Sequence, residues 1–290
     1  MKTIFLGTGS ASGIPDPFCS CDYCKKIREL GGKNLRKRSS FLLDDKILLD
    51  FSPDIRTQII ENKIDFNKIK GIVLSHTHND HLDIQELIKI KDSVHVFINE
   101  ISYEWLNSEI KKGIKPKHQA KLIERTQHLN ITPMKNFIPF EFEGFEFTPI
   151  EARHTGLNAG ELGMNFIIKD KYNSTRLHAS DTGVYSEKTF NFIKNYRFDS
   201  IVIECTFLDC NKNNVDHLDL KTLKEVLTKL EEFKSINSKT PIIVTHFGHD
   251  PMKTHKEIEE LVKKLPFNIS VAYDSMEYVS PTYNENDDAL

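Results

Sequence analysis

A run of potential metal ligands directly after an apolar stretch restricts the fold of this chain more than any other feature. Residues 71–75 read G-I-V-L-S, and His76, His78, Asp80 and His81 follow within six residues, after which a helical pattern begins. Neutral imidazole and carboxylate together suit Zn, Mn or Fe. Two histidines separated by one residue in an extended turn can reach the same ion, whereas Asp80 and His81 point toward a neighbouring position. The pattern therefore predicts a strand, a turn that binds two adjacent metal ions, and a helix.

Three further candidate ligands each follow an apolar, strand-like stretch. His154 comes after F-T-P-I-E-A-R, Asp181 after T-R-L-H-A-S, and His246 after P-I-I-V-T. Ligands collect at the carboxyl ends of strands in open α/β sheets, so we expect these side chains at the same edge as the first group. Holding two ions with room left for water takes about six protein ligands or more. The chain supplies enough of them for a two-metal site.

The periodicity of apolar residues indicates an α/β protein with mixed sheets. Residues 41–50 predict two short strands around a D-D turn, and residues 137–150 predict a second hairpin around an E-G turn. Hairpins combined with strand-helix alternation place helices on the outer faces of the sheets. The helix-period stretches are 54–63, 82–91, 186–195, 219–233 and 252–264.

Length and composition limit the number of domains, the partners and the cellular location that we expect. With 290 residues, 39% of them apolar, the chain can bury a large core, and we expect one domain over residues 1–280 with a frayed acidic tail over 281–290. The formal net charge of -3 excludes a global positive field for nucleic acid. The first apolar run is too short for a signal peptide, and no stretch approaches the ~20 apolar residues of a membrane helix. We expect a soluble, cytoplasmic protein without a membrane partner, and a homodimer is one open form of assembly.

Residues 101–125 form a basic stretch that we interpret as a helical insertion. Charge runs of this kind usually serve as solvated helix faces, and a flap that faces the substrate is the alternative. The positive charges of this stretch are Lys111, Lys112, Lys115, Lys117, Lys121 and Arg125.

A cluster of cysteines near the N-terminus predicts a second kind of metal site. Cys19, Cys21 and Cys24 are too close together for a disulfide framework, and such dense thiols in a reducing compartment usually bind metal. A closed structural zinc site takes four ligands, and His249 would provide the fourth if the N-terminal loop folds over the strand end at His246. A redox-active cluster is the alternative. The other two cysteines lie apart in the sequence, and we assign them no function.

The ligand run H-T-H-N-D-H resembles the H-x-H-x-D-H signature of the metallo-β-lactamase superfamily, and the later His, Asp and His match its remaining ligand positions in order. The resemblance covers nearly the whole chain and implies an αββα sandwich of two mixed sheets flanked by helices, with two ions at one edge. An Asp at the bridging position resembles the phosphodiesterase, nuclease and glyoxalase-like branches, whereas many lactamases have Cys there, so antibiotic hydrolysis is not expected. The ligand assignment that the resemblance implies is one ion on His76, His78 and His154, the other on Asp80, His81 and His246, and Asp181 as the bridge.

Asp50, at the end of I-L-L, matches the superfamily Asp that orients the ligand loop. It is followed by Phe-Ser, whereas the superfamily usually has Ala-Gly or a similar pair. An Asp that simply caps the next turn therefore stays an open alternative.

A narrower resemblance links the two groups of candidate ligands. The G-T-G-S opening, the early cysteine cluster and the T-H-x-x-H end are similar to PhnP-type cyclic phosphodiesterases, in which a structural zinc pins the N-terminal loop beside the catalytic site. The competing interpretation of the opening, a phosphate-binding P-loop, lacks a following G-K-[ST]. By the same resemblance, His217 in N-N-V-D-H-L-D is the candidate general acid, with capping of a helix start as its alternative.

Together these features predict a phosphodiesterase. Two divalent ions, Zn or Mn, would activate a hydroxide toward a cyclic or small phosphodiester, with Asp80 and His217 as the predicted catalytic side chains and one further zinc as a structural ion. The expected substrate is a small phosphodiester such as a cyclic nucleotide or a cyclic sugar phosphate. An RNA-processing endonuclease resembling tRNase Z is the first alternative, which the negative net charge weakens. A non-catalytic accessory protein that binds metal or ligand is the second.

Overall fold

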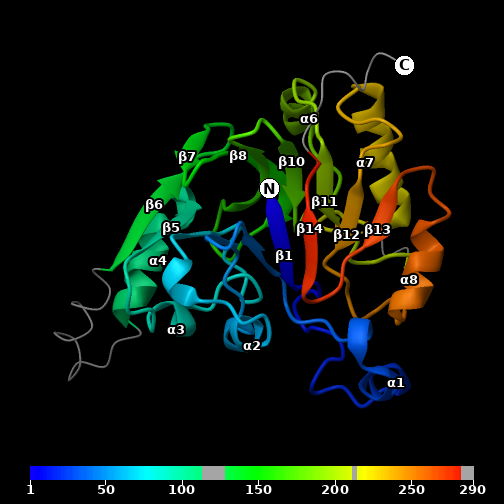
Figure 1. The fold of residues 1–290 in the computed structure, drawn as a ribbon, viewed down its shortest axis with the longest axis horizontal. Coiled ribbons are helices and arrows are strands. Elements are labelled where there is room, and N and C mark those ends of the chain that lie inside the picture. Colours follow the sequence, from blue (N-terminus) through cyan, green and yellow to red (C-terminus); the bar gives the residue numbers. More distant parts are fainter. Residues whose placement is uncertain (113–127, 211–213, 282–290) are drawn as a thin grey trace.

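Two mixed β-sheets face each other in the computed structural model, which describes residues 1–112, 128–210 and 214–281 (Figure 1). Each sheet has seven strands within these residues, and helices lie on the outer sides. The predicted α/β class and αββα sandwich are confirmed. Two predicted segments, residues 282–290 of the acidic tail and residues 113–125 of the basic insertion, lie outside the described residues.

The first sheet is built from the N-terminal half of the chain and one C-terminal strand. Its strands in spatial order are β14 (Met276–Val279), β1 (Lys2–Gly7), β2 (Ser40–Leu43), β3 (Ile47–Leu49), β4 (Gly71–Val73), β5 (Val94–Asn99) and β6 (Leu129–Met134). The predicted hairpin joins β2 to β3, and Asp44 and Asp45 adopt φ of 45° and 58° in its turn. Asp tolerates this left-handed backbone better than most residues do. From β3 to β6 the strands run parallel, so the segments after β4 and β5 leave from the same edge.

The second sheet carries the other half of the candidate ligands. Its strands in spatial order are β13 (Ile269–Val271), β12 (Ile242–Thr245), β11 (Ser200–Glu204), β10 (Thr175–Ala179), β9 (Leu162–Asp170), β8 (Phe145–Thr155) and β7 (Phe140–Phe142). The predicted hairpin around Glu143 and Gly144 joins β7 to β8. Because β10, β11, β12 and β13 run parallel, their carboxyl ends meet at one edge of this sheet.

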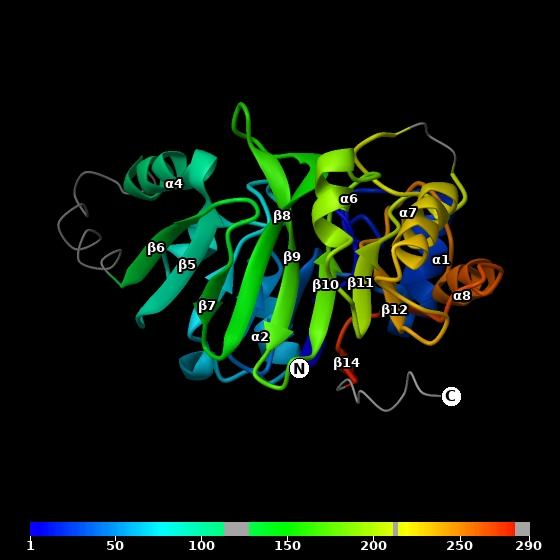
Figure 2. The same ribbon diagram turned by 90° about the horizontal axis from the view of Figure 1, so that it is seen from above.

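Helices cover the outer face of each sheet. The α-helices of the described residues are α1 (Asp22–Leu30), α2 (Ile55–Glu61), α3 (Ile84–Leu87), α4 (Glu100–Lys112), α6 (Glu187–Ile193), α7 (Leu220–Glu232) and α8 (His255–Val262). Apolar side chains of α2, α3 and α4 pack on the first sheet, and those of α1, α6, α7 and α8 pack on the second. The ribbon view of Figure 2 shows α6 and α7 beside the strands of the second sheet. None of these helices has the length and apolar character needed to cross a lipid bilayer.

The predicted helix over residues 82–91 is much shorter in the structure than the sequence pattern indicates. Only residues 84–87 are helical, after the Asp83 side chain accepts a 3.0 Å hydrogen bond from the Glu86 N–H and caps the start. Three isoleucines between positions 84 and 90 lower the helix propensity. The chain must also enter β5 at Val94, which leaves little length for further turns.

Aromatic side chains fill the space between the two sheets. Phe5 and Phe41 of the first sheet and Phe147 and Phe166 of the second are all at most 1% exposed and belong to one apolar cluster. The rings of Phe147 and Phe166 meet edge to face, with centroids 6.4 Å apart, which suits the charge distribution of aromatic rings. This layer fixes the position of one sheet on the other, and with it the relative position of their strand ends.

Truncating this layer should weaken the whole molecule. We expect Phe147→Ala to lower the free energy of unfolding by about 3–5 kcal/mol, because the lost contacts leave a cavity, as measured by chemical denaturation. Phe18→Ala is the matched control, since that side chain is 98% exposed, and it should change stability by less than about 0.5 kcal/mol. A loss at Phe147 no larger than the control's would contradict the role of the aromatic layer.

Candidate metal centre

Side chains from both sheets gather at one edge of the sandwich. The turn after β4 brings a histidine-rich run, β8 contributes a histidine near its end, and one candidate ligand follows each of β10 and β12. All seven side chains predicted for the two-metal site lie together there. They form two groups, His76, His78 and His154 in the first and Asp80, His81, Asp181 and His246 in the second.

The first group consists of three imidazoles that converge on one point. His78 Nδ1 lies 3.0 Å from His76 Nε2 and 3.0 Å from His154 Nε2. His76 and His154 are buried, while His78 is half-buried. Burial, together with the positive charge that His81 can carry, lowers the pKa of His76 well below its ordinary value. His76 is therefore neutral, and neutral imidazole is the form that binds a metal.

The second group combines imidazoles with carboxylates. His246 Nε2 lies 2.9 Å from Asp181 Oδ1, and His81 Nε2 lies 3.2 Å from Asp181 Oδ2 and 3.3 Å from Asp80 Oδ2. Burial lowers the pKa of His81, but the charges of Asp181 and Asp80 outweigh it and raise that pKa well above its ordinary value. The two carboxylates thus create a strongly negative environment that favours positive charge at this place.

Asp181 faces both groups. Its Oδ2 atom lies 3.6 Å from His76 Nε2 and 3.7 Å from His154 Nε2 in the first group, while both of its oxygens approach the second. The Asp181 residue is 3% exposed. This is the position that a carboxylate needs in order to bridge two neighbouring ions.

Unpaired buried atoms show that the second group fits a cation. His81 Nε2, His246 Nε2 and Asp181 Oδ1 are buried without a hydrogen-bond partner among the described residues, although neighbouring polar atoms lie close enough to each. Buried polar atoms are normally paired, and leaving one unpaired costs about 1–3 kcal/mol. Lone pairs that converge without hydrogen-bond geometry are expected where several atoms bind the same ion.

Hydrogen bonds to the ring nitrogens that face away from the metal centre fix the orientation of the His81 and His154 rings. His81 Nδ1 lies 2.7 Å from Asp50 Oδ2, and the Ser75 N–H donates to Asp50 Oδ1 at 2.7 Å. Asp50 therefore lies where it can orient the ligand turn. The described contacts of its carboxylate go to Ser75 and His81 rather than to the turn that follows Asp50 in the chain. On the other side of the centre, His154 Nδ1 lies 3.0 Å from the Asp216 carbonyl oxygen. Such contacts select the ring nitrogen that is left for the metal.

Glu204, at the end of β11, is a buried carboxylate that the sequence interpretation did not select. Its side chain is fully buried, and its Oε1 atom lies 2.7 Å from His217 Nδ1 and accepts a 2.8 Å hydrogen bond from the Thr182 N–H. Its Oε2 atom accepts a hydrogen bond from Thr206 Oγ1, which in turn lies 3.0 Å from His246 Nδ1. Glu204 thus connects the segments after β10 and β12 with His217. The signal available in the sequence was an acidic residue that ends an otherwise apolar strand.

His217, the predicted general acid, lies beside the two ligand groups. Its ring centroid is 4.7 Å from that of His154 and 5.7 Å from that of His246. Burial lowers the pKa of His217, but the Glu204 carboxylate outweighs burial and the net shift is upward. This environment favours a protonated imidazole, which is the form that can donate a proton.

A pocket of about 540 Å³ opens over the centre. His78, Asp80 and Asp181 form part of its floor, and His217 lines it as well. Other lining residues include the Ser10–Ser12 turn, Leu157, Phe207 and the Gly248–Asp250 turn. The described part of the basic segment, in α4, contributes no lining residue, which favours the solvated-face interpretation for residues 101–112.

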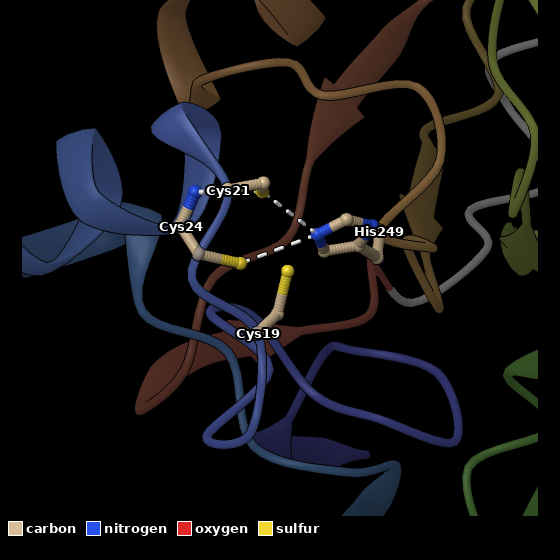
Figure 3. A group of neighbouring side chains, drawn as sticks. All are labelled: Cys19, Cys21, Cys24 and His249. Atoms are coloured by element: carbon tan, nitrogen blue, oxygen red, sulfur yellow. Dashed lines mark hydrogen bonds between the residues drawn. The ribbon is translucent and has the colours of Figure 1, made fainter.

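The three cysteines of the N-terminal cluster lie close to His249, because the N-terminal loop folds over the strand end at His246. Cys19, Cys21 and Cys24 turn their sulfur atoms toward the imidazole (Figure 3), with His249 Nε2 3.2 Å from Cys24 Sγ and 3.6 Å from Cys21 Sγ. Cys21 also caps α1, because the Cys24 N–H donates to its sulfur, and this contact is the main reason that its pKa falls to about 6. A thiolate is the form of Cys that binds zinc. The four side chains fit the tetrahedral ligand set of a structural zinc.

A family model described as a beta-lactamase superfamily domain matches residues 45–247. The chain therefore belongs to this superfamily, and its two-sheet sandwich is the metallo-β-lactamase fold. A curated octanoyltransferase from Porphyromonas gingivalis (strain ATCC BAA-308 / W83) is 35% identical over 86 residues, which cover 28% of this chain and only 16% of that protein.

Solved structures share the fold over nearly the whole chain. A diphosphatase from the PhnP family superposes with a TM-score of 0.70 at 21% identity, covering 97% of this chain and 99% of that one. Zn²⁺-bound PqqB from Methylobacterium extorquens gives 0.72 at 14% identity, covering 96% and 100%. The short form of human tRNase Z gives 0.62 at 15% identity, covering 97% and 100%. At these identities the similarity concerns the fold alone.

The two kinds of site should be separable by metal analysis. We expect the purified protein to hold three divalent ions per chain, two in the strand-end groups and one in the cysteine cluster. Cys21→Ser should remove one zinc per chain and lower the thermal stability, because one zinc ligand is lost while serine can still cap α1. Asp22→Asn, on the neighbouring and fully exposed side chain, is the control that should keep all three ions. Unchanged metal content in Cys21→Ser would reject the structural zinc.

Proposed function

We propose that this protein is a metal-dependent hydrolase that cleaves a small or cyclic phosphodiester. The observation that carries the proposal is the buried Asp181 carboxylate shared by two groups of ligands, with His217 beside them on the same pocket and the buried Glu204 in contact with His217 Nδ1. The first ion would be held by the three histidines of the first group and the second by Asp80, His81 and His246, with Asp181 between them.

Phosphodiester cleavage requires an activated nucleophile, stabilisation of charge on phosphorus and protonation of the leaving oxygen. Two bound divalent ions supply a hydroxide near neutral pH and hold the phosphoryl oxygens. His217 would provide the proton, because its Nδ1 is engaged by Glu204 and its Nε2 is left for the pocket. Glu204 keeps the ring in one tautomer and orientation, as a carboxylate behind a catalytic histidine does in other enzymes.

Four considerations support hydrolysis of a small phosphorylated substrate over the alternatives. The solved PhnP-family protein with this fold is named a diphosphatase, and a diphosphate is also cleaved at phosphorus. The pocket volume of about 540 Å³ suits a small molecule. A tRNase Z-like activity would call for positive charge that binds RNA, whereas the formal net charge of the chain is -3. The intact ligand groups and the His217–Glu204 pair argue for catalysis rather than a purely accessory role.

Removing one carboxylate ligand should stop the reaction without unfolding the protein. We expect Asp80→Ala and Asp181→Ala to reduce hydrolysis of bis(p-nitrophenyl) phosphate by at least about 10³-fold, since the second ion is no longer held. Circular dichroism should remain that of the wild-type protein. Asp92→Asn, at an exposed position, is the carboxylate control and should keep the full rate. Full activity of Asp80→Ala or Asp181→Ala would rule out the two-metal mechanism.

The role of His217 should depend on the leaving group. A general acid contributes roughly 10²–10⁴-fold when the leaving group is a basic alkoxide, but a nitrophenolate leaves without a proton. We expect His217→Ala to lose at least about 10²-fold on a 2′,3′-cyclic nucleotide and less than about 10-fold on bis(p-nitrophenyl) phosphate, with Glu204→Gln following the same trend.

His95→Ala, at an exposed position on β5, is the histidine control for this comparison. It should leave both rates unchanged. Equal losses on the two substrates in His217→Ala would show that His217 supports the site in another way and does not donate the proton.

A further inference from the structure

Ligands of the two metal sites lie only three positions apart in the chain. His246 belongs to the second strand-end group, and His249 belongs to the cysteine cluster (Figure 3). His246 has a backbone φ of 58°, in the left-handed region that residues other than glycine rarely adopt. Such a conformation costs free energy and persists only where the surrounding structure enforces it. The segment 246–249 must therefore be held on both sides of this residue.

Backbone hydrogen bonds hold the middle of the segment. The Phe247 N–H donates to the Thr8 carbonyl oxygen, and the Phe247 carbonyl oxygen accepts from the Ser10 N–H, both at 3.0 Å. The Gly248 N–H donates to the Thr206 carbonyl oxygen at 3.0 Å. A Cβ atom at position 248 would come within 2.9 Å of that oxygen, so the close approach requires glycine. These contacts tie the segment to the loop after β1 and to the end of β11.

Side-chain contacts also hold Phe247 and His249 in this segment. The guanidinium of Arg36 lies 4.3 Å from the centre of the Phe247 ring, and Arg36 donates to Thr8 Oγ1 at 2.8 Å. A cation over an aromatic face is an attractive contact. At the far end, His249 is held by the cysteine sulfurs and by the edge-to-face contact of the Tyr23 ring, with centroids 5.6 Å apart. The cysteine cluster is therefore the anchor at the C-terminal end of the strained segment.

We propose that the Cys19–Cys21–Cys24–His249 cluster is the positioning element for His246. Metal at the cysteines then strengthens metal binding by the Asp80–His81–His246 group and has a much smaller effect on the His76–His78–His154 group. The inference rests on the proposed two-metal function. We expect the two groups to respond differently because the first group has supporting contacts of its own. Its members bond to Ser75, to the Asp216 carbonyl oxygen and to one another. Asp181 links this group to His246, but Asp181 lies 3.6 Å from His76 and 3.7 Å from His154, compared with 2.9 Å from His246.

The experiment isolates each half of the strand-end site in a separate parent variant. His76→Ala/His78→Ala retains the half with His246, and Asp80→Ala/His81→Ala retains the half with His154. Cys21→Ser is then introduced into each parent, with Asp22→Asn as the matched control on the same helix. Binding is measured by titrating Mn²⁺ and following the free ion by electron paramagnetic resonance, because Mn²⁺ prefers oxygen and imidazole ligands to thiolates.

We expect Cys21→Ser to weaken Mn²⁺ binding at least about ten-fold, or about 1.4 kcal/mol, in the parent that retains His246. In the other parent the change should be less than about two-fold, and Asp22→Asn should change neither. Equal weakening in both parents, or none in either, would overturn the proposal. If Cys21→Ser fails to fold, Cys19→Ser provides the same comparison. Cys19 is half-exposed and lies outside α1.

The outcomes separate this inference from the function on which it rests. If the wild-type protein binds two Mn²⁺ ions at the strand ends but Cys21→Ser weakens Mn²⁺ binding equally in both parents, the positioning role alone is overturned. Wild-type protein that cannot bind two ions at the strand ends would overturn the two-metal function and the positioning role together.

Discussion

The Asp181 carboxylate is buried between two groups of imidazoles, and the edge of both sheets is arranged around it. A buried carboxylate without compensating positive charge is costly, and its neighbours within 2.9–3.7 Å come from the turn after β4, from β8 and from the segment after β12. No single sheet could supply all of these. The aromatic layer that joins the sheets therefore contributes to the chemistry, because it sets the distance between the strand ends that surround this carboxylate.

Two further carboxylates behind the centre determine how the ligands are presented. Asp50 holds His81 and the ligand turn from the first sheet, and Glu204 holds His217 from the second. Through Thr206, Glu204 also reaches His246. The site is thus supported symmetrically, with one buried carboxylate at the end of a strand in each sheet. The segment from His246 to His249 adds a link to the cysteine cluster, so the N-terminal loop becomes part of the support of the metal centre.

Much of this arrangement is readable from the sequence because metal ligands leave a strong signal. The H-x-H-x-D-H run, the strand ends before Asp181 and His246, and the cysteine spacing all depend on local pattern, and the structure brings these residues together. Glu204 was not predicted as a site residue, because one acidic residue at the end of a strand has many ordinary explanations. Its partner His217 lies 13 residues further along the chain, and only the fold shows that the chain brings His217 back to Glu204. The helix α1 was missed for a related reason, since its cap is a cysteine rather than the usual Ser, Thr, Asp or Asn.

The most direct test of the two-metal centre is to titrate metal back into protein whose strand-end sites have been emptied while the zinc proposed for the cysteine cluster is retained. Hydrolysis of bis(p-nitrophenyl) phosphate is followed as Mn²⁺ or Zn²⁺ is added. We expect negligible rate without added metal and an increase that continues until two equivalents are bound. Full hydrolysis by the emptied protein, or a rate that is already maximal at one equivalent, would contradict a centre in which Asp181 bridges two ions.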